Sequence, residues 1–165
     1  MHICHLILSN IGGAPKIANS LISSQKKAGN QVSTVVFTDL DSGWIVDFKD
    51  AEKVIIMKVA GSGFYIGGAM HQIWIAMQLS KVIAEIKPDI IVCHTAFISK
   101  LFYFSQMIPG SVKNPYIIYI HTDFISELQA ESKINSLIGI WQNLSIRVDN
   151  WVSLLSLKQA NGLVF

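Results

Sequence analysis

The amino-acid sequence predicts a doubly wound α/β domain, in which helices cover both faces of a parallel β-sheet. Short runs rich in Ile, Val, Leu and Tyr alternate with longer segments of helical periodicity, as in successive right-handed βαβ units. These short runs are almost continuously apolar, which is typical of strands buried on both faces. The 165 residues fit one domain, and 51% of them are apolar against 15% charged, which excludes disorder as the main state.

Five strands are expected, and all of them are short and rich in branched apolar residues. They cover Ile3–Leu8, Val32–Phe37, Val54–Val59, Ile90–Val92 and Tyr116–Ile120. Three helices are expected between these strands. They begin at Pro15, at about Ala69 and at Phe97, and they end before Gly29, at Ile86 and at Met107. Proline suits the first turn of a helix, whereas glycine or a following proline ends one, so the boundaries follow from residue type.

Apolar stripes predict which face two of these helices bury. Apolar residues that recur at intervals of three and four are expected to face the sheet. In the first helix the stripe is Ile17, Ala18, Leu21, Ile22 and Ala28, and in the second it is Ile73, Met77, Val82 and Ile83.

The C-terminal part of the chain has a different pattern. Residues 133–158 predict one or two helices that are apolar on nearly every side, and such helices must be buried against another surface. Asn161 and Gly162 are a turn signal, and residues 163–165 resemble the start of a sixth strand. Because a domain rarely ends just inside a hydrophobic strand, we expect residues 1–165 to be the N-terminal domain of a longer protein.

Charge, hydropathy and cysteine content narrow the class of protein. The formal net charge of +2 gives no electrostatic case for a nucleic-acid partner. The mean hydropathy of +0.43 is high, yet no apolar run approaches the ~18 to 20 residues that span a bilayer. The N-terminus lacks a signal-peptide pattern, and two cysteines are too few for a disulfide framework. We therefore expect a cytoplasmic protein.

Three polar loops follow expected strands and are candidates for a binding site. Ligands of open α/β sheets bind outside the carboxyl ends of the strands, where the strand order reverses. The first strand leads into residues 9–13, the fourth into His94 and Thr95, and the fifth into His121 and Thr122. We expect these loops to share one rim of the sheet.

Gly12 and Gly13 predict a site for a phosphate or another anion. Without a Cβ atom, glycine lets the backbone approach a ligand closely. The N-terminus of the following helix offers unpaired N–H groups and the positive end of its dipole, and Lys16 in the first turn adds a charge. The alternatives are a tight turn without a ligand and a solvated surface lysine. The spacing does not match the G-x-G-x-x-G fingerprint of dinucleotide-binding domains.

His121 is the candidate catalytic residue, because a polar side chain at the end of an apolar strand has little packing role. A histidine there can exchange a proton near neutral pH or donate a hydrogen bond to a sugar hydroxyl. His94 is a candidate by the same argument of position, and a hydrogen-bonded structural histidine is the alternative for both. His2 and His5 are expected at the opposite end of the first strand, in structural roles. No two histidines have helical metal-ligand spacing, so no metal site is expected.

Three segments together resemble the opening of family 4 glycosyltransferases. The first covers residues 12–16 (GGAPK), followed by an amphipathic helix that Gly29 closes and by the strand from Val32. The others cover residues 86–94 (IKPDIIVCH) and residues 116–121 (YIIYIH). They stand in the family's order and spacing and cover nearly the whole chain.

The resemblance implies the GT-B fold, in which two Rossmann-like domains face each other across a cleft. This chain would be the N-terminal, mostly acceptor-binding domain, and the C-terminal donor-binding domain is absent from it. The family transfers sugar from a nucleotide-sugar with retention of configuration, usually without a bound metal. The resemblance places Gly12 and Gly13 near the donor phosphate or sugar, His121 beside the transferred sugar, and His94 on an adjacent loop.

The sequence departs from the family at three positions. The family often has Glu where Pro15 stands, His where Asn30 stands and another His where Val92 stands. These departures leave the acceptor open.

Two functions of different classes follow. The first is the acceptor-side domain of a retaining glycosyltransferase, inactive without its C-terminal domain, acting on a glycan or lipid-linked acceptor as in polysaccharide biosynthesis. Its apolar helices would pack on the missing domain or contact the inner membrane face. The alternative is a non-catalytic Rossmann-like module that binds a nucleotide or another phosphorylated ligand. Replacing His121 in the complete protein should cripple turnover in the first case and barely matter in the second.

Overall fold

The computed structural model of the chain describes residues 1–8, 13–39, 47–59, 68–119, 155–156 and 158–164. The described strands form one six-stranded, all-parallel sheet in the order β3-β2-β1-β4-β5-β6. The strands are β1 (His2–Leu8), β2 (Gln31–Asp39), β3 (Lys53–Val59), β4 (Ile90–Cys93), β5 (Tyr116–Tyr119) and β6 (Gly162–Val164). The helices are α1 (Ala14–Lys27), α2 (Gly68–Ile86) and α3 (Ala96–Met107). The predicted fold class and the predicted sixth strand are therefore confirmed.

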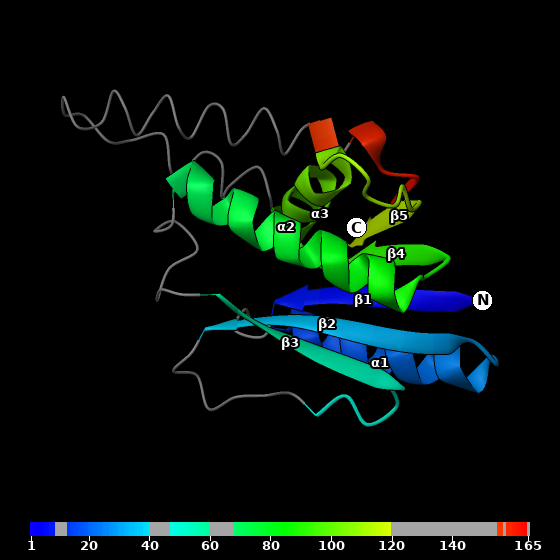
Figure 1. Ribbon diagram of the computed structural model, residues 1–165. Coiled ribbons are helices and arrows are strands. Elements are labelled where there is room, and N and C mark those ends of the chain that lie inside the picture. The colour runs from blue at the N-terminus through cyan, green and yellow to red at the C-terminus, as the bar shows by residue number, and fades with distance from the viewer. Residues whose placement is uncertain (9–12, 40–46, 60–67, 120–154, 157, 165) are drawn as a thin grey trace.

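The order of the strands reverses beside β1, at the centre of the sheet. In β1, Cys4 lies opposite Ser33 of β2 on one side and opposite Ile91 of β4 on the other. The chain runs outward through β2 and β3 and then returns to place β4 against the free side of β1 (Figure 1). The carboxyl ends of β1 and β4 therefore meet at the topological switch point, where ligands of such sheets bind.

Helices cover both faces of the sheet, as the sequence predicts (Figure 1). On one face α1 packs over β1 and β2, with Ala18 and Ile22 in a cluster that includes Ile7. On the other face α2 and α3 pack against each other above a cluster that includes Leu6 and Leu8. Because successive residues of a strand point to opposite faces, one apolar run in β1 supplies both clusters.

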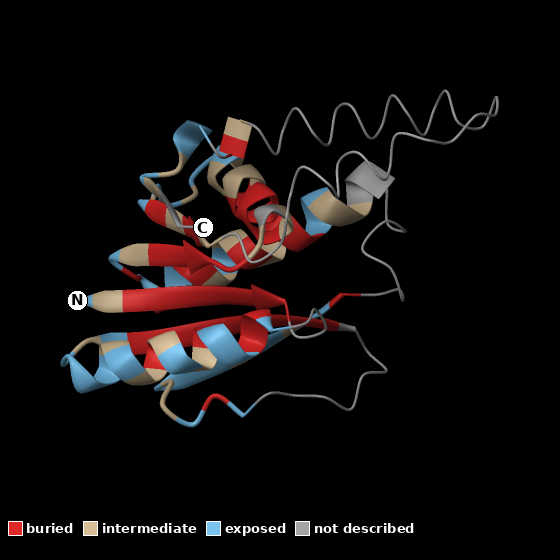
Figure 2. Cartoon of the chain, turned by 180° about the vertical axis from the view of Figure 1, so that it is seen from behind, coloured by how far each residue is buried: buried red, intermediate tan, exposed pale blue. Residues whose placement is uncertain are grey.

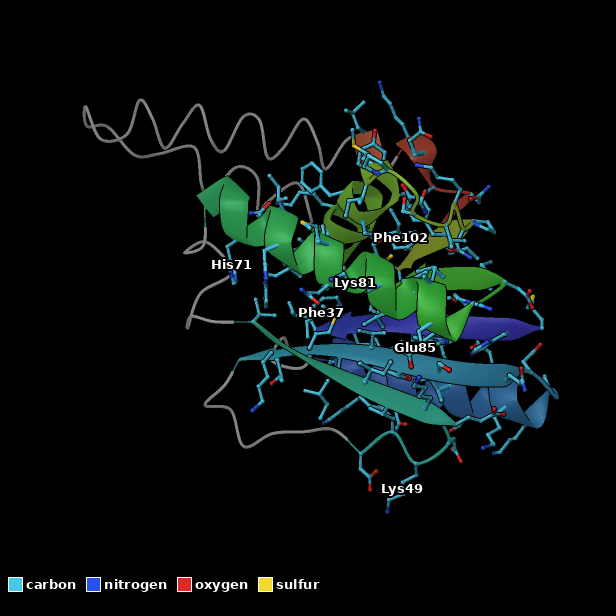
Figure 3. The ribbon with its side chains drawn as sticks, viewed as in Figure 1. Phe37, Lys49, His71, Lys81, Glu85 and Phe102 are labelled. Atoms are coloured by element: carbon cyan, nitrogen blue, oxygen red, sulfur yellow. The ribbon has the colours of Figure 1, made fainter. Side chains whose placement is uncertain are left out.

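The larger apolar core lies beneath α2 and α3. Phe37 of β2 and Phe102 of α3 belong to it, and both side chains are fully buried (Figure 3). Figure 2 shows β1 and β4 buried along almost their whole length, which fits the buried-strand pattern of their sequences. Burial of central strands on two faces accounts for much of the high mean hydropathy of the chain.

The two ends of α1 follow from residue type. Gly13 is the N-cap residue, and Pro15 lies in the first turn, where its missing N–H leaves no helix hydrogen bond unmade. Lys26 and Lys27 lie in the last turn, near the negative end of the helix dipole. Gly29 follows with φ of +82°, a left-handed conformation that favours glycine just beyond a helix.

The buried faces of the two helices differ in part from the predicted stripes. Ala18 and Ile22 of α1 are buried as expected, but Ile17 is 45% exposed. In α2, Ile73 and Met77 are 47% and 44% exposed, and the prediction that they face the core is wrong. Ile83 is buried as predicted, and the other described side chains of α2 that are buried are Ile75, Ala76, Leu79 and Ile86. Because α2 is apolar on most sides, its periodicity does not select one face, and packing against α3 and the sheet selects it.

The described C-terminal residues attach to α3 and β5. The Ser156 hydroxyl lies 3.1 Å from the Ser99 hydroxyl of α3, and both side chains are fully buried. The Tyr116 hydroxyl of β5 donates a hydrogen bond of 2.5 Å to the carbonyl oxygen of Ser156. These contacts hold the segment that leads into β6 beside β5. Most of the predicted apolar helices at 133–158 lie outside the described residues.

No helix within the described ranges combines the length and the apolar character needed to cross a bilayer.

Candidate functional site

The carboxyl ends of β1 and β4 and the N-termini of α1 and α3 lie at one edge of the sheet (Figure 1). Gly13 and Lys16 lie at the start of α1, and His94 and Thr95 lie between β4 and α3, so all four belong to this edge, while their roles in a binding site stay predictions. The other predicted site residues are Gly12, His121 and Thr122, and they lie outside the described residues.

Gly13 caps α1 without any conformational need for glycine. Its φ of −81° and ψ of −12° are in the ordinary right-handed helical region. A Cβ atom built there would meet no atom within 4 Å, and the residue is exposed. Its carbonyl oxygen accepts hydrogen bonds from the backbone N–H groups of Lys16 and Ile17. Neither the turn nor the packing therefore requires glycine, and the open space on its Cα is available to a ligand.

The first turn of α1 carries positive charge only. Lys16 is exposed there, and the turn contains no acidic residue to offset the helix dipole. Gly13, the N-cap residue, has no side chain that could cap this turn. Such a helix end attracts anions, and the phosphate site stays a prediction.

His94 lies where the sequence places it but is fully buried. Its backbone N–H donates a hydrogen bond of 3.1 Å to the carbonyl oxygen of Leu6, which extends the pairing of β4 with β1. Its Nε2 lies 2.8 Å from Nδ1 of His5. The ring stacks on His5 and on Tyr119, with centroids 5.1 and 5.6 Å apart. The His94 imidazole is thus held on several sides.

His5 contacts His94, and its predicted position in the first strand is wrong. It lies in the middle of β1 rather than at the end remote from the site, and its side chain has no exposed surface. Its Nε2 lies 2.7 Å from the amide oxygen of Gln25 in α1. Burial lowers the pKa of the His5 imidazole to about 4, against the weaker opposing effect of the hydrogen bond to Gln25. His5 is therefore neutral at physiological pH.

The burial of His5 could have been predicted in part from its position in the first strand. It alternates with Ile3 and Ile7, so it belongs on the face that α1 covers, and a buried histidine needs partners. Gln25 and His94 are 20 and 89 residues away, and only the βαβ packing brings them to it.

Thr95 has a structural role in addition to its position at the rim. It is the N-cap residue of α3, and its hydroxyl oxygen accepts a hydrogen bond of 3.2 Å from the backbone N–H of Ile98. This contact satisfies one of the N–H groups that have no partner within the helix. The predicted substrate contact through Thr95 stays a prediction.

Replacing Thr95 by alanine is expected to lower the free energy of unfolding by about 1 kcal/mol, the usual value of an N-cap hydrogen bond. Thr95→Ser keeps the hydroxyl oxygen and is expected to retain most of this stability. Urea unfolding of both variants measures the difference. Equal losses in the two variants would show that the methyl group, rather than the cap, stabilises this helix end.

Two kinds of side chain could add chemistry at this edge: the free cysteines Cys4 and Cys93, whose thiols are both buried, and groups that could bind a metal. Burial raises the pKa of the Cys4 thiol to about 12 and that of Cys93 well above its ordinary value, so both remain thiols. Among the residues with described positions, no group of three or more His, Cys, Asp and Glu side chains could hold a metal ion. The expected absence of a metal stays a prediction for the complete site.

Comparison with known proteins gives structural neighbours only. No protein-family model matches the sequence, and no curated protein sequence is similar to it. The fold matches the lipopolysaccharide outer core galactosyltransferase WaaB in its apo form, at a TM-score of 0.61 and 14% identity over 79% of this chain. It also matches MurG of Acinetobacter baumannii, at a TM-score of 0.58 and 10% identity over 99% of this chain.

Both neighbours are GT-B glycosyltransferases, and the present chain spans 36% and 40% of their lengths. At these identities the likeness shows the fold, which is that of N-terminal GT-B domains.

Proposed function

We propose that this chain is the acceptor-side N-terminal domain of a glycosyltransferase, and that the complete enzyme transfers a sugar from a nucleotide-sugar to a glycan or lipid-linked acceptor. The main supporting observation is the likeness to the two glycosyltransferases, which extends over most of this chain but under half of theirs. A second domain that holds the donor is part of the proposal. The resemblance to family 4 adds retention of configuration.

The edge at the switch point offers groups suited to such a donor. A nucleotide-sugar carries a diphosphate, and the first turn of α1 presents the positive end of the helix dipole and Lys16, with no acidic residue in that turn. Gly13 leaves the backbone open to close approach. These groups supply positive charge that would otherwise come from a metal, which fits the proposal of a metal-independent enzyme.

We assign the catalytic role to His121, with Gly12, Thr122, His94 and Thr95 in binding roles. A histidine at the end of β5 would exchange a proton or donate a hydrogen bond at the transferred sugar. The alternative function, a non-catalytic module for a nucleotide or phosphorylated ligand, needs only the glycine turn and α1.

The experiment that tests the function uses the complete protein encoded by the gene. Reading the coding sequence beyond Phe165 comes first, and we expect a second βαβ domain there. The purified protein is then incubated with a panel of nucleotide-sugars and lipid or glycan acceptors. We expect release of nucleoside diphosphate, and a loss of turnover of about a hundredfold or more on replacing His121 by alanine. Nucleotide binding without turnover would instead favour the non-catalytic module.

Gly13→Ala separates a ligand role from a turn role. Because the backbone at Gly13 has φ of −81°, which alanine adopts without strain, and a Cβ atom has room there, we expect the melting temperature to stay nearly unchanged. Affinity for the nucleotide-sugar should fall about tenfold if the backbone approaches the ligand there. The matched control is Gly29→Ala, at φ of +82°, which should destabilise the domain without a specific effect on affinity. Unchanged affinity in Gly13→Ala would remove Gly13 from the site.

The proposed location is the cytoplasm, with peripheral contact at the inner membrane face. Ile73, Trp74 and Met77 of α2 are all 44 to 51% exposed, and apolar side chains of this kind can enter a lipid interface. Co-sedimentation of the complete protein with anionic vesicles tests this contact. Trp74→Ser should reduce the bound fraction, and binding equal to the unmodified protein would exclude α2 as the contact.

A further inference from the structure

A row of three hydrogen-bonding side chains runs from α1 through β1 to the end of β4. The amide oxygen of Gln25 lies 2.7 Å from Nε2 of His5, and Nδ1 of His5 lies 2.8 Å from Nε2 of His94. Both imidazoles are fully buried, and they stack at 5.1 Å with an interplanar angle of 26°. Nothing in the candidate site described above assigns a role to His5 or Gln25.

The amide oxygen of Gln25 determines which atom donates in each of the two hydrogen bonds of the row. An amide oxygen only accepts, so Nε2 of His5 must carry the proton that it donates. His5 is neutral, so its Nδ1 carries the lone pair and accepts. Nε2 of His94 must therefore be protonated in order to donate to it. The same order holds whether His94 itself is neutral or cationic, because both forms can donate from Nε2.

We propose that Gln25 and His5 are positioning residues that keep Nε2 of His94 protonated and fix its ring, so that His94 exchanges protons or accepts hydrogen bonds through Nδ1 alone. The row ends in an amide, which does not take up a proton near neutral pH, so it orients His94 without carrying a proton away. The expected effect of Gln25 and His5 on sugar transfer rests on the proposed function, whereas the protonation of the two imidazole rings is independent of it.

The neighbours of His5 support an orienting role over a charged one. Across the sheet it lies between Thr34 of β2 and Val92 of β4, and all three side chains are buried. None of these neighbours, and neither Gln25 nor His94, carries a carboxylate that would stabilise an imidazolium. Burial without a counter-charge keeps His5 neutral, which is the state that an acceptor at Nδ1 requires.

The test measures which ring nitrogen of each histidine is protonated. The complete protein is labelled with ¹⁵N in histidine, and the resonances are assigned through His5→Asn and His94→Gln variants. Protonated and unprotonated ring nitrogens differ clearly in ¹⁵N shift. In the unmodified protein at neutral pH we expect His5 as the Nε2–H tautomer and His94 with a protonated Nε2.

Two substitutions at Gln25 should disturb the protonation pattern in different ways. Gln25→Met keeps the length of the side chain but removes the acceptor, so His5 and His94 should each populate both tautomers. Gln25→Glu places a carboxylate beside His5, which stabilises its imidazolium, so Nδ1 of His5 should become a donor and Nε2 of His94 should lose its proton. Lys26→Met, one residue along on the exposed side of α1, is the matched control and should leave the tautomers unchanged. An unchanged pattern in a folded Gln25→Met protein would overturn the inference.

Sugar transfer by the same proteins tests the functional part. Partners that orient metal-binding histidines are worth about ten- to a hundredfold, and we expect an effect of this order here, with kcat of Gln25→Met falling by roughly tenfold. Gln25→Glu, which should reverse the hydrogen bond between His5 and His94, is not expected to recover this loss. Mixed tautomers with unchanged kcat would overturn the functional part alone. If the unmodified protein transfers no sugar, the proposed function fails, while the tautomer measurement still decides the positioning of His94.

Discussion

Replacing Leu79 by alanine is expected to lower the free energy of unfolding by about 2 to 5 kcal/mol, whereas Met77→Ala should change it by less than about 1 kcal/mol. Both residues lie in α2 and have similar volumes. Leu79 is fully buried in the core beneath α2 and α3, so its removal leaves a cavity and loses apolar burial. Met77 is 44% exposed, and its removal opens no enclosed space.

Urea unfolding of the two variants checks this pair. The comparison also distinguishes the packing in the structure from the packing predicted by the apolar stripe, because the stripe includes Met77 and omits Leu79. A larger loss for Met77→Ala than for Leu79→Ala would mean that α2 is rotated about its axis relative to the described packing.

The domain is expected to lose stability as the pH falls from about 6.5 to about 4, because of His5. In the unfolded chain this imidazole binds a proton below its ordinary pKa of 6.5, whereas in the folded chain burial lowers the pKa to about 4. Between these values the unfolded state binds more protons, so protons favour unfolding and stability rises with pH. The difference between the two pKa values corresponds to about 3 kcal/mol, fully present above pH 6.5.

Unfolding free energies measured at pH 4.5, 5.5 and 7 test this dependence. His5→Leu removes the buried imidazole and should flatten the pH dependence, even if its stability at pH 7 is lower. His2→Gln keeps His5 and should leave the contribution of His5 in place. Identical pH dependence in His5→Leu and the unmodified protein would mean that His5 does not resist protonation.

The fold could be predicted because its signals are local. Each described strand is an apolar run, and Pro15, Gly29 and Pro88 mark helix boundaries that the structure reproduces within one or two residues. The parallel sheet with helices on both faces followed from the βαβ alternation, whereas the order of the strands comes from the structure. The buried face of α2 could not be predicted in the same way, because several of its sides are apolar. Packing against α3 and the sheet determines which of these sides is buried.

The edge of the sheet where a ligand would bind could be predicted from the sequence, but the side-chain contacts at this edge could not. The carboxyl ends of β1 and β4 lie side by side at the switch point because parallel strands end at the same edge, which is a property of topology. The contact between His5 and His94 joins residues 89 positions apart, and Gln25 reaches His5 only because α1 lies back across β1. The cap formed by Thr95 was within reach of the sequence, because threonine just before a helical run is a common N-cap.

The central place of β1 has a consequence for how the chain folds during synthesis. Residues 2–39 suffice to form β1, α1 and β2, so one side of β1 can pair early and over a short loop. The other side pairs with β4, which begins at Ile90. At roughly 5 to 20 residues per second, the ribosome needs several seconds to make the intervening chain. Through that interval the nascent domain carries an unpaired apolar strand edge, and mispairing with other chains competes there with completion of the sheet.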